Sequence, residues 1–308
     1  METCDNKTEK KIDPGFSYNL VIGVVGPYGA GASSIAHEMK DNLNNWPGIE
    51  VNIIVVADLI KKYYNYYYDD DLVVDNSESA ERRKVLQNAG TKIRLKDRLA
   101  TAKIIISEIT AKGRISEEIN NKESENIGTR VFIIDCLKNE NEVKELRRIY
   151  GDEFYLFYVH SSRENRWRRM VDYKGWSSRK RVDFEERDII DYDEKSKDQK
   201  VEDAGQEVAK LSTMADYYVV NNYNRQKLKN ESNRFLNLLF GSGMNQPTFD
   251  ERSMHIAFSA SNRSFCLSRQ VGAVIVDEHG IILGVGHNDV PKANGGLYTQ
   301  EDGQDDKR

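Results

Sequence analysis

A glycine-rich segment between an apolar run and a helical pattern constrains the fold of this chain more than any other feature. The apolar run YNLVIGVVG (18–26) leads into GPYGAGASS (26–34), and the helical pattern IAHEMKDNL follows. Backbone N–H groups in such a loop can surround a phosphate at the amino end of a helix. The segment predicts a nucleotide-binding phosphate loop that contains Gly26, Gly29, Gly31, Ser33 and Ser34.

The loop lacks the lysine that most phosphate loops direct at the outer phosphates, because Ala32 occupies that position. A charge-assisted hydrogen bond to a phosphate contributes about 1.5–3 kcal/mol, and the same charge supports phosphoryl transfer. We therefore expect binding of a magnesium nucleotide, whereas the missing lysine argues against kinase or ATPase turnover. A glycine-rich turn that only packs the strand against the helix is the alternative interpretation.

Asp135 is the second candidate at this site, because it closes the apolar run VFIID. An acid at the end of a strand beside a phosphate loop can hold the water shell of a magnesium ion. Capping of the following helix explains the same residue equally well. A basic segment at 166–181 also has several interpretations: a solvated helix face, a phosphate-clamping lid or a nucleic-acid contact, in that order of preference.

Apolar runs alternate with helical patterns along the chain, which predicts an α/β fold with a parallel five-stranded sheet covered on both faces. The five predicted strands cover residues 18–26, 51–60, 129–137, 154–162 and 216–222. The main predicted helices cover residues 77–110, 139–151 and 224–240.

Composition sets wider limits on the function. A net charge of −5 makes nucleic acid an unfavourable partner. Three isolated cysteines indicate a reducing compartment, no segment is apolar enough to span a membrane, and the amino-terminal residues do not form a signal peptide, so a cytoplasmic protein is predicted. The predicted organisation is a polar tail (1–17), a nucleotide-binding domain (18–241), a linker (242–247) and a short C-terminal segment (248–308).

Residues 18–240 resemble the nucleoside-monophosphate-kinase group of P-loop proteins. The C-terminal segment combines a predicted helix (248–265), the run RQVGAVIV (269–276) and the tripeptide Gly286-His287-Asn288. This combination resembles the opening α-β-β segment of the deoxycytidylate deaminases, whose nucleotide contacts the asparagine of this tripeptide. The resemblance implies a substrate-binding role for Asn288; an asparagine that only shapes a turn is the alternative.

Kinase-like and deaminase-like parts in this order resemble the bacterial anti-phage dCTP deaminases. The resemblance implies hydrolytic deamination of dCTP or dCMP and a zinc cofactor held by H-x-E and P-C-x-x-C motifs. The sequence contains neither motif, so no catalytic or metal-ligating residue is assigned and the chain alone is expected to be inactive. The expected explanation is a fragment, a truncated gene or one half of a split protein.

Three functional hypotheses follow from the sequence. The first is a deaminase-family member completed by a second chain, the second a nucleoside or nucleotide kinase, and the third a non-catalytic nucleotide sensor that binds dTTP or ATP. A helix with one hairpin buries too little to be stable alone. Residues 248–290 are therefore expected to pack on the nucleotide-binding domain, to bind a partner chain, or to remain loose and expose an apolar sheet face. Homo-oligomerisation, a second chain or poor solubility is the expected consequence.

Overall fold

The computed structural model describes residues 18–68, 72–74, 80–123, 128–192, 199–222, 225–241 and 245–298. The chain divides into two compact units, Met1–Ser242 (unit 1) and Gly243–Arg308 (unit 2). The predicted polar tail and residues 242–244 of the predicted linker lie outside the described residues. Among the helices of the described ranges, none has the length and apolar character needed to cross a bilayer.

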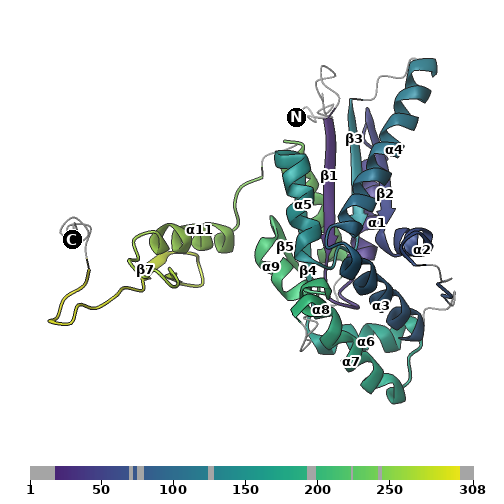
Figure 1. The fold of residues 1–308 in the computed structure, drawn as a ribbon. Helices are drawn as coiled ribbons and strands as arrows, with labels where there is room; N and C mark the ends of the chain where they lie inside the picture. The colour runs from purple at the N-terminus through teal and green to yellow at the C-terminus, as the bar shows by residue number, and fades with distance from the viewer. Residues whose placement is uncertain are drawn as a thin grey trace, which may run out of the picture. The chain divides into compact units, whose positions relative to one another are not determined.

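Unit 1 is built on a sheet of five parallel strands in the order β2-β3-β1-β4-β5 (Figure 1). These strands are β1 (Tyr18–Val25), β2 (Ile49–Val55), β3 (Thr129–Asp135), β4 (Phe154–His160) and β5 (Tyr217–Val220). The predicted five-stranded parallel sheet is confirmed. With the glycine-rich loop directly after its central strand, unit 1 has a P-loop kinase-like α/β fold.

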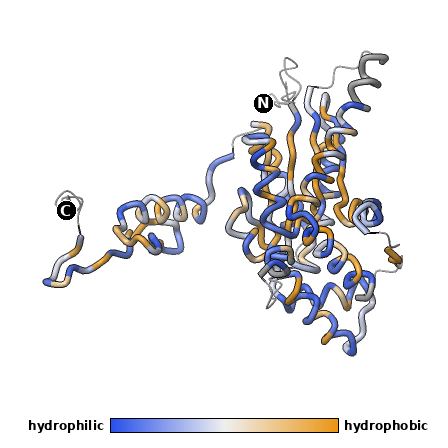
Figure 2. The backbone as a smooth tube through the Cα atoms, viewed as in Figure 1, coloured by the Kyte–Doolittle hydropathy of each residue, from blue (hydrophilic) through white to orange (hydrophobic). Residues whose placement is uncertain are grey.

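Helices cover both faces of this sheet, and alternate residues of β1 explain why. Val21 and Val25 enter one apolar core, to which α2, α3, α4 and α5 contribute, whereas Ile22 and Val24 enter a second core with α1 and α10. Figure 2 shows the same pattern as hydrophobic colour along the strands. A strand that is buried on both faces needs apolar residues at every position, which is why the strands read as continuous apolar runs.

The helices of unit 1 mostly connect one strand to the next, as a parallel sheet requires. They are α1 (Ala32–Leu43), α2 (Val56–Tyr67), α3 (Ala80–Lys96), α4 (Ala100–Glu123), α5 (Glu140–Tyr150), α6 (Arg163–Lys174), α7 (Arg181–Tyr192), α8 (Gln199–Ala204), α9 (Val208–Met214) and α10 (Arg225–Leu239). Two short 3₁₀ helices, η1 (Gly151–Glu153) and η2 (Ser178–Lys180), precede β4 and α7.

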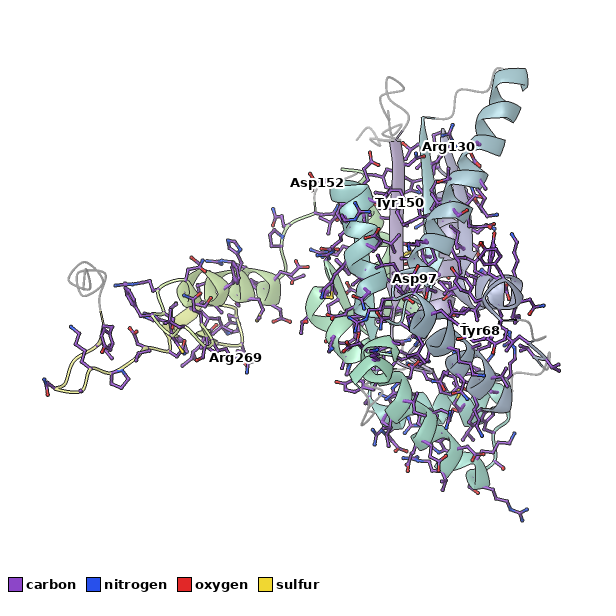
Figure 3. The ribbon with its side chains drawn as sticks, in the orientation of Figure 1. Tyr68, Asp97, Arg130, Tyr150, Asp152 and Arg269 are labelled. Atoms are coloured by element: carbon purple, nitrogen blue, oxygen red, sulfur yellow. The ribbon has the colours of Figure 1, made fainter. Side chains whose placement is uncertain are left out.

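The predicted single helix at 77–110 is wrong, because the structure has two helices there, α3 and α4. The break falls at Asp97, which Figure 3 labels, and the carboxylate of Asp97 accepts a 2.9 Å hydrogen bond from the backbone N–H of Leu99. A side chain that binds an N–H two residues further on forms an Asx turn, and this turn separates α3 from the start of α4 at Ala100. The sequence shows helical periodicity on both sides of Asp97, so it does not indicate the break between the two helices.

The predicted strand at 51–60 is too long, since β2 ends at Val55 and α2 begins at Val56. Val56, Leu59 and Ile60 are all buried. Their spacing of three and four residues places them on one face of a helix, although the same apolar residues are also compatible with a strand.

Unit 2 consists of α11 (Phe249–Ser261) and an antiparallel hairpin of β6 (Gly272–Val276) and β7 (Ile282–His287). The predicted hairpin is present, and at its turn the N–H of Gly280 donates a 3.1 Å hydrogen bond to the carbonyl of Asp277. The helix ends at Ser261, earlier than the predicted 265. It contacts one face of the hairpin so closely that a Cβ on Gly272 would lie 1.8 Å from the carbonyl oxygen of Ala257.

Candidate functional site

The glycine-rich loop lies between the carboxyl end of β1 and the start of α1. Gly29 and Gly31 have φ values of +78° and +99°, and a Cβ on Gly31 would lie only 2.7 Å from the amide nitrogen of Asn221. Glycine is the residue that adopts such values at no steric cost. Gly31 is also the N-cap of α1, where no side chain caps the helix and no acidic residue occupies the first turn. The N–H groups at this helix start can therefore bind an anion.

Ser33 and Asp135, which the sequence places far apart, are in direct contact. Asp135 ends β3, the neighbour of β1, and the hydroxyl of Ser33 donates a 2.9 Å hydrogen bond to Oδ1 of Asp135. Burial raises the pKa of Asp135, and the hydrogen bond from Ser33 opposes that shift. The carboxylate of Asp135 does not cap α5, whose N-cap is Asn139. Ser34, the remaining predicted loop residue, is exposed on the first turn of α1.

A magnesium ion fits this pair of side chains. Magnesium prefers oxygen ligands, and at nucleotide sites it takes one or two from the protein and the rest from water and phosphate. A hydroxyl and a carboxylate 2.9 Å apart, beside an uncapped helix start, provide that arrangement.

Two arginines of α6 hold the loop by its carbonyl groups. Arg166 donates a 2.9 Å hydrogen bond to the carbonyl of Tyr28, and Arg169 donates hydrogen bonds of 3.1 Å and 3.3 Å to the carbonyls of Gly29 and Ala30. These contacts fix the orientation of the loop's peptide groups. The preferred sequence interpretation, a solvated face at 166–181, is wrong for both arginines.

The same segment supplies a small apolar cluster beside the loop. Trp167 and Trp176 are buried in it, together with Tyr28, Met170 and Phe184. Arg166 also forms a buried ion pair with Asp188 of α7, with a distance of 3.0 Å between Nη2 and Oδ2. Spacing of three residues between Trp167 and Met170 was the available signal that one face of α6 is buried.

Lys138 and Asp191 were not predicted as site residues, yet both contact the loop. The ammonium group of Lys138 donates a 3.0 Å hydrogen bond to the carbonyl of Gly26, and its Nζ lies 2.8 Å and 2.9 Å from the two carboxylate oxygens of Asp191. The same carboxylate accepts a 2.7 Å hydrogen bond from the backbone N–H of Tyr28. A lysine three residues after Asp135 was the only trace of this contact in the sequence.

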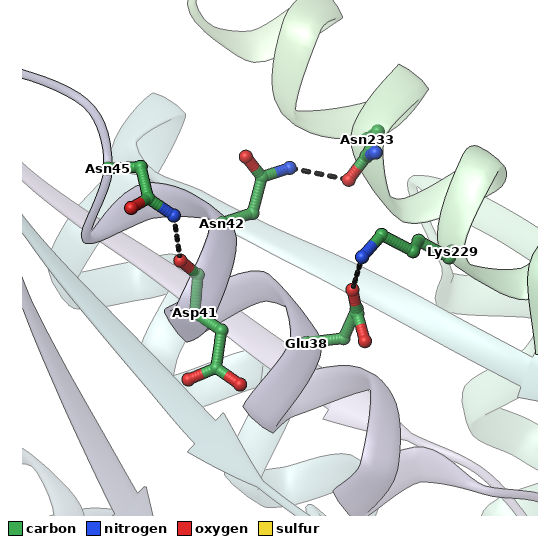
Figure 4. Close-up of a pocket in the computed structure, with 6 residues that line it drawn as sticks. All are labelled: Glu38, Asp41, Asn42, Asn45, Lys229 and Asn233. Atoms are coloured by element: carbon green, nitrogen blue, oxygen red, sulfur yellow. Dashed lines mark hydrogen bonds and ion pairs between the residues drawn. The ribbon is translucent and has the colours of Figure 1, made fainter.

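A small polar hollow of about 200 Å³ lies elsewhere, between α1 and α10 (Figure 4). Glu38, Asp41, Asn42, Asn45, Lys229 and Asn233 line it. The ammonium group of Lys229 is 2.8 Å from a carboxylate oxygen of Glu38, and the second half of α1 carries the negative end of the helix dipole. Both features disfavour a phosphate, so the hollow is not part of the candidate nucleotide site.

In unit 2 the side chain of Asn288 joins two backbone segments. Its Oδ1 accepts a 2.7 Å hydrogen bond from the N–H of Val271, and its Nδ2 donates a 2.9 Å hydrogen bond to the carbonyl of Arg269. Across the described parts of both units, no cluster of three or more His, Cys, Asp or Glu side chains could hold a metal ion. The zinc implied by the deaminase resemblance therefore has no fitting ligand set among these residues.

Comparisons with known proteins show only a distant likeness to solved structures. No family model and no curated protein matches the chain. Solved structures that resemble it include shikimate kinase from Acinetobacter baumannii in complex with shikimate (11% identity, TM-score 0.35, 73% of this chain and 96% of that one).

Two further structures resemble the chain to a similar degree. They are the Mycobacterium tuberculosis APS kinase CysC in complex with AMPPNP and APS (13%, TM-score 0.36, 72% and 98%) and TT1252 from Thermus thermophilus (16%, TM-score 0.39, 74% and 100%). Likeness at this level identifies no substrate or activity, and the description of unit 1 depends on its own strand order and glycine-rich loop.

Proposed function

We propose that unit 1 binds a magnesium nucleotide, with the phosphates held by residues 26–34. The contact between Ser33 and Asp135 carries this proposal, because it brings a hydroxyl and a carboxylate, the oxygen groups that would hold a magnesium ion and its water shell, to the uncapped start of α1. A loop that only packed a strand against a helix would need neither a hydroxyl nor a buried carboxylate at this point. Burial raises the pKa of Asp135, so keeping this carboxylate ionised has a free-energy cost, which residues at binding sites commonly bear.

Each part of the site has a defined task in this proposal. Backbone N–H groups of the loop and of the first turn of α1 bind phosphate oxygens. The Ser33 hydroxyl is a direct ligand of magnesium, and the Asp135 carboxylate orients the water shell of the ion. Bound magnesium neutralises phosphate charge. Arg166 and Arg169 keep the loop in its binding conformation through its carbonyl groups.

Isothermal titration calorimetry of the whole chain with ATP, dTTP and dCTP, with and without magnesium, tests this proposal. We expect saturable binding that weakens when magnesium is removed, and a loss of about tenfold or more in the variants Ser33→Ala and Asp135→Asn. Ser212→Ala is the matched control, because Ser212 is on α9 and donates its hydroxyl only to the carbonyl of Ala209. Equal affinity with and without magnesium would contradict the assigned roles of Ser33 and Asp135.

Assays of phosphoryl transfer with the same nucleotides separate a kinase from a nucleotide sensor. Because residue 32 is alanine, we expect binding with little or no transfer to nucleoside or nucleotide acceptors. Sustained product formation that Ser33→Ala abolishes would establish the kinase alternative instead.

A second candidate function concerns unit 2, a deaminase-type segment that contacts a deoxycytidine nucleotide. The observation in its favour is the order helix, strand, strand, with α11 packed against the strand RQVGAVIV at Gly272. The only cysteines are Cys4, Cys136 and Cys266, so we expect this chain alone not to deaminate dCTP or dCMP. Under this proposal a second chain would supply the zinc ligands.

Binding of dCMP distinguishes the two units. If unit 2 contacts the nucleotide, Asn288→Ala weakens dCMP binding while Ser33→Ala leaves it unchanged. If Ser33→Ala abolishes dCMP binding and Asn288→Ala does not change it, dCMP binds only at the phosphate loop. That result would contradict the second candidate function.

A further inference from the structure

The phosphate loop lacks a lysine of its own, but a lysine from another segment lies against it. Lys138 follows β3, and its ammonium group donates a hydrogen bond to the carbonyl of Gly26, the first residue of the loop. Lys138 is more than 100 residues away from this carbonyl in the sequence. Its side chain is largely buried, with 13% of its surface exposed.

The backbone around Lys138 is held in an unusual conformation. Cys136, directly after Asp135, has a φ of +75° and is the only residue other than glycine with a positive φ among those the structure describes. For a residue with a Cβ, this left-handed backbone conformation has a free-energy cost of about 1–2 kcal/mol. Such strain is concentrated at functional sites, where the surrounding structure maintains it.

Buried contacts on the other side of Lys138 maintain this turn. The N–H of Lys138 donates a 2.8 Å hydrogen bond to Oε2 of Glu142, and Oε1 of Glu142 accepts a 3.1 Å hydrogen bond from Arg94 in α3. Glu142 and Arg94 are almost fully buried. The position of Lys138 beside the loop is therefore fixed from the backbone as well as from the side chain.

Lys138 and the loop both bind the carboxylate of Asp191. Its ammonium group and the N–H of Tyr28 converge on the carboxylate of Asp191, which is fully buried. An ammonium group and a loop N–H that share one carboxylate provide the same kind of donors that bind a phosphate oxygen.

We propose that Lys138 supplies the ammonium group for the outer phosphates of a nucleotide at this loop, in place of the lysine absent at residue 32, and that Asp191 is its counter-ion when no nucleotide is bound. This inference rests on the proposed nucleotide binding by unit 1. Three arginines lie beside the loop, and each has other contacts. Arg166 binds Tyr28 and Asp188, Arg169 binds carbonyls of the loop, and the guanidinium of Arg83 lies over the ring of Tyr28, 4.3 Å from its centroid. Lys138 contacts both the start of the loop and the carboxylate of Asp191, and a phosphate could replace that carboxylate.

Two variants with opposite effects test the proposal by calorimetry with MgATP, MgdCTP and magnesium tripolyphosphate. In Asp191→Asn, loss of the competing carboxylate frees Lys138, and we expect affinity for the triphosphates to rise about fivefold. In the double variant Lys138→Met/Asp191→Asn, no charge is left buried without a partner. Its affinity is expected to fall about 10- to 100-fold below that of Asp191→Asn.

A lysine exchange provides the second test. Adding Ala32→Lys to the double variant places an ammonium group at the usual loop position, and we expect most of the lost affinity to return. Lys144→Met is the matched control, because Lys144 is an exposed lysine of α5 that pairs with Glu140, and its affinity is expected to equal that of the unaltered chain.

The outcomes separate this inference from the proposed function. If the unaltered chain binds the triphosphates and the double variant binds them as tightly as Asp191→Asn, Lys138 is only a structural partner of Asp191 and the inference is overturned. A fall in affinity in Asp191→Asn similar to that in the double variant also overturns it. If the unaltered chain binds none of the three probes, the proposed function itself fails.

Discussion

The two units of this chain bury their sheets to very different extents. In unit 1, helices cover both faces of the five-stranded sheet, and every residue of β3 is buried. In unit 2, α11 packs on the hairpin from one side, whereas Ile275, Leu283 and Val285 of its two strands are each more than half exposed. A two-stranded hairpin with one covered face is marginal by itself, because little apolar area leaves the solvent.

The difference shows how far each unit can support a precise binding site. Unit 1 tolerates a strained residue at Cys136 and several buried ion pairs around its loop, because a large surrounding core holds them in place. Unit 2 has a single helix to position its strands, and Asn288 connects backbone segments there.

The largest expected contrast comes from truncating one apolar side chain in each unit. Phe157→Ala in β4 removes a fully buried ring and should lower the free energy of unfolding of unit 1 by about 3–5 kcal/mol. Leu283→Ala in β7 removes a side chain that is 67% exposed and should cost below about 1 kcal/mol. Urea denaturation followed by circular dichroism measures both. Similar costs would show that the exposed face of unit 2 is covered in solution.

A second contrast lies within unit 2, between two glycines of the hairpin. Gly272→Ala would place a Cβ 1.8 Å from the carbonyl oxygen of Ala257, so α11 must move and the hairpin should lose about 1–3 kcal/mol. Gly284→Ala is the matched control, because a Cβ there meets no atom within 4 Å. Amide hydrogen exchange in residues 272–287 is the measurement. Equal protection in the two variants would mean that α11 does not pack on this hairpin.

The third prediction concerns the pH dependence of nucleotide binding to unit 1. Burial raises the pKa of Asp135, so its carboxyl group holds a proton at pH values where an exposed aspartate has lost it. Since magnesium requires the ionised form, affinity for MgATP should increase as the pH rises through this raised pKa, by at most about tenfold per pH unit. Without magnesium, the charged form costs stability, so the free energy of unfolding should fall over the same range.

Calorimetry from about pH 5 to about pH 8 measures this dependence. Asp135→Asn is the control, because it keeps the shape of the side chain and removes its titration. The dependence should then flatten. An unchanged pH profile in this variant would assign the effect to another group.

Most of the fold of unit 1 could be predicted from the sequence, because strands buried on both faces leave continuous apolar runs. Two errors have one physical origin: local patterns report burial, but not where a chain turns. Val56–Ile60 is as apolar as a strand yet forms a helix, and Asp97 separates two helices through a hydrogen bond that periodicity does not record.

The site was only partly predictable. Its glycines and serines are adjacent in the sequence, and Asp135 was found because it ends an apolar run. Lys138 and Asp191 could not be found, because their relation to the loop depends on the turn at Cys136 and on the packing of α7 against Tyr28. Contacts of this kind arise from tertiary structure, and the spacing of Lys138 from Asp135 alone does not predict them.

The smallest expected effect on stability comes from Leu283→Lys, which tests the exposed face of unit 2 in another way. Lysine on an exposed strand position should change the free energy of unfolding by less than about 0.5 kcal/mol.

An uncovered apolar sheet face favours association at high concentration, and a charge placed on it opposes this association. Light scattering across a concentration series should show association of the unaltered chain that Leu283→Lys reduces. Glu278→Gln, an exposed change in the hairpin turn, is the control, because it shifts the net charge by the same one unit as Leu283→Lys. If the two variants associate equally, net charge governs the behaviour and the uncovered face of unit 2 does not.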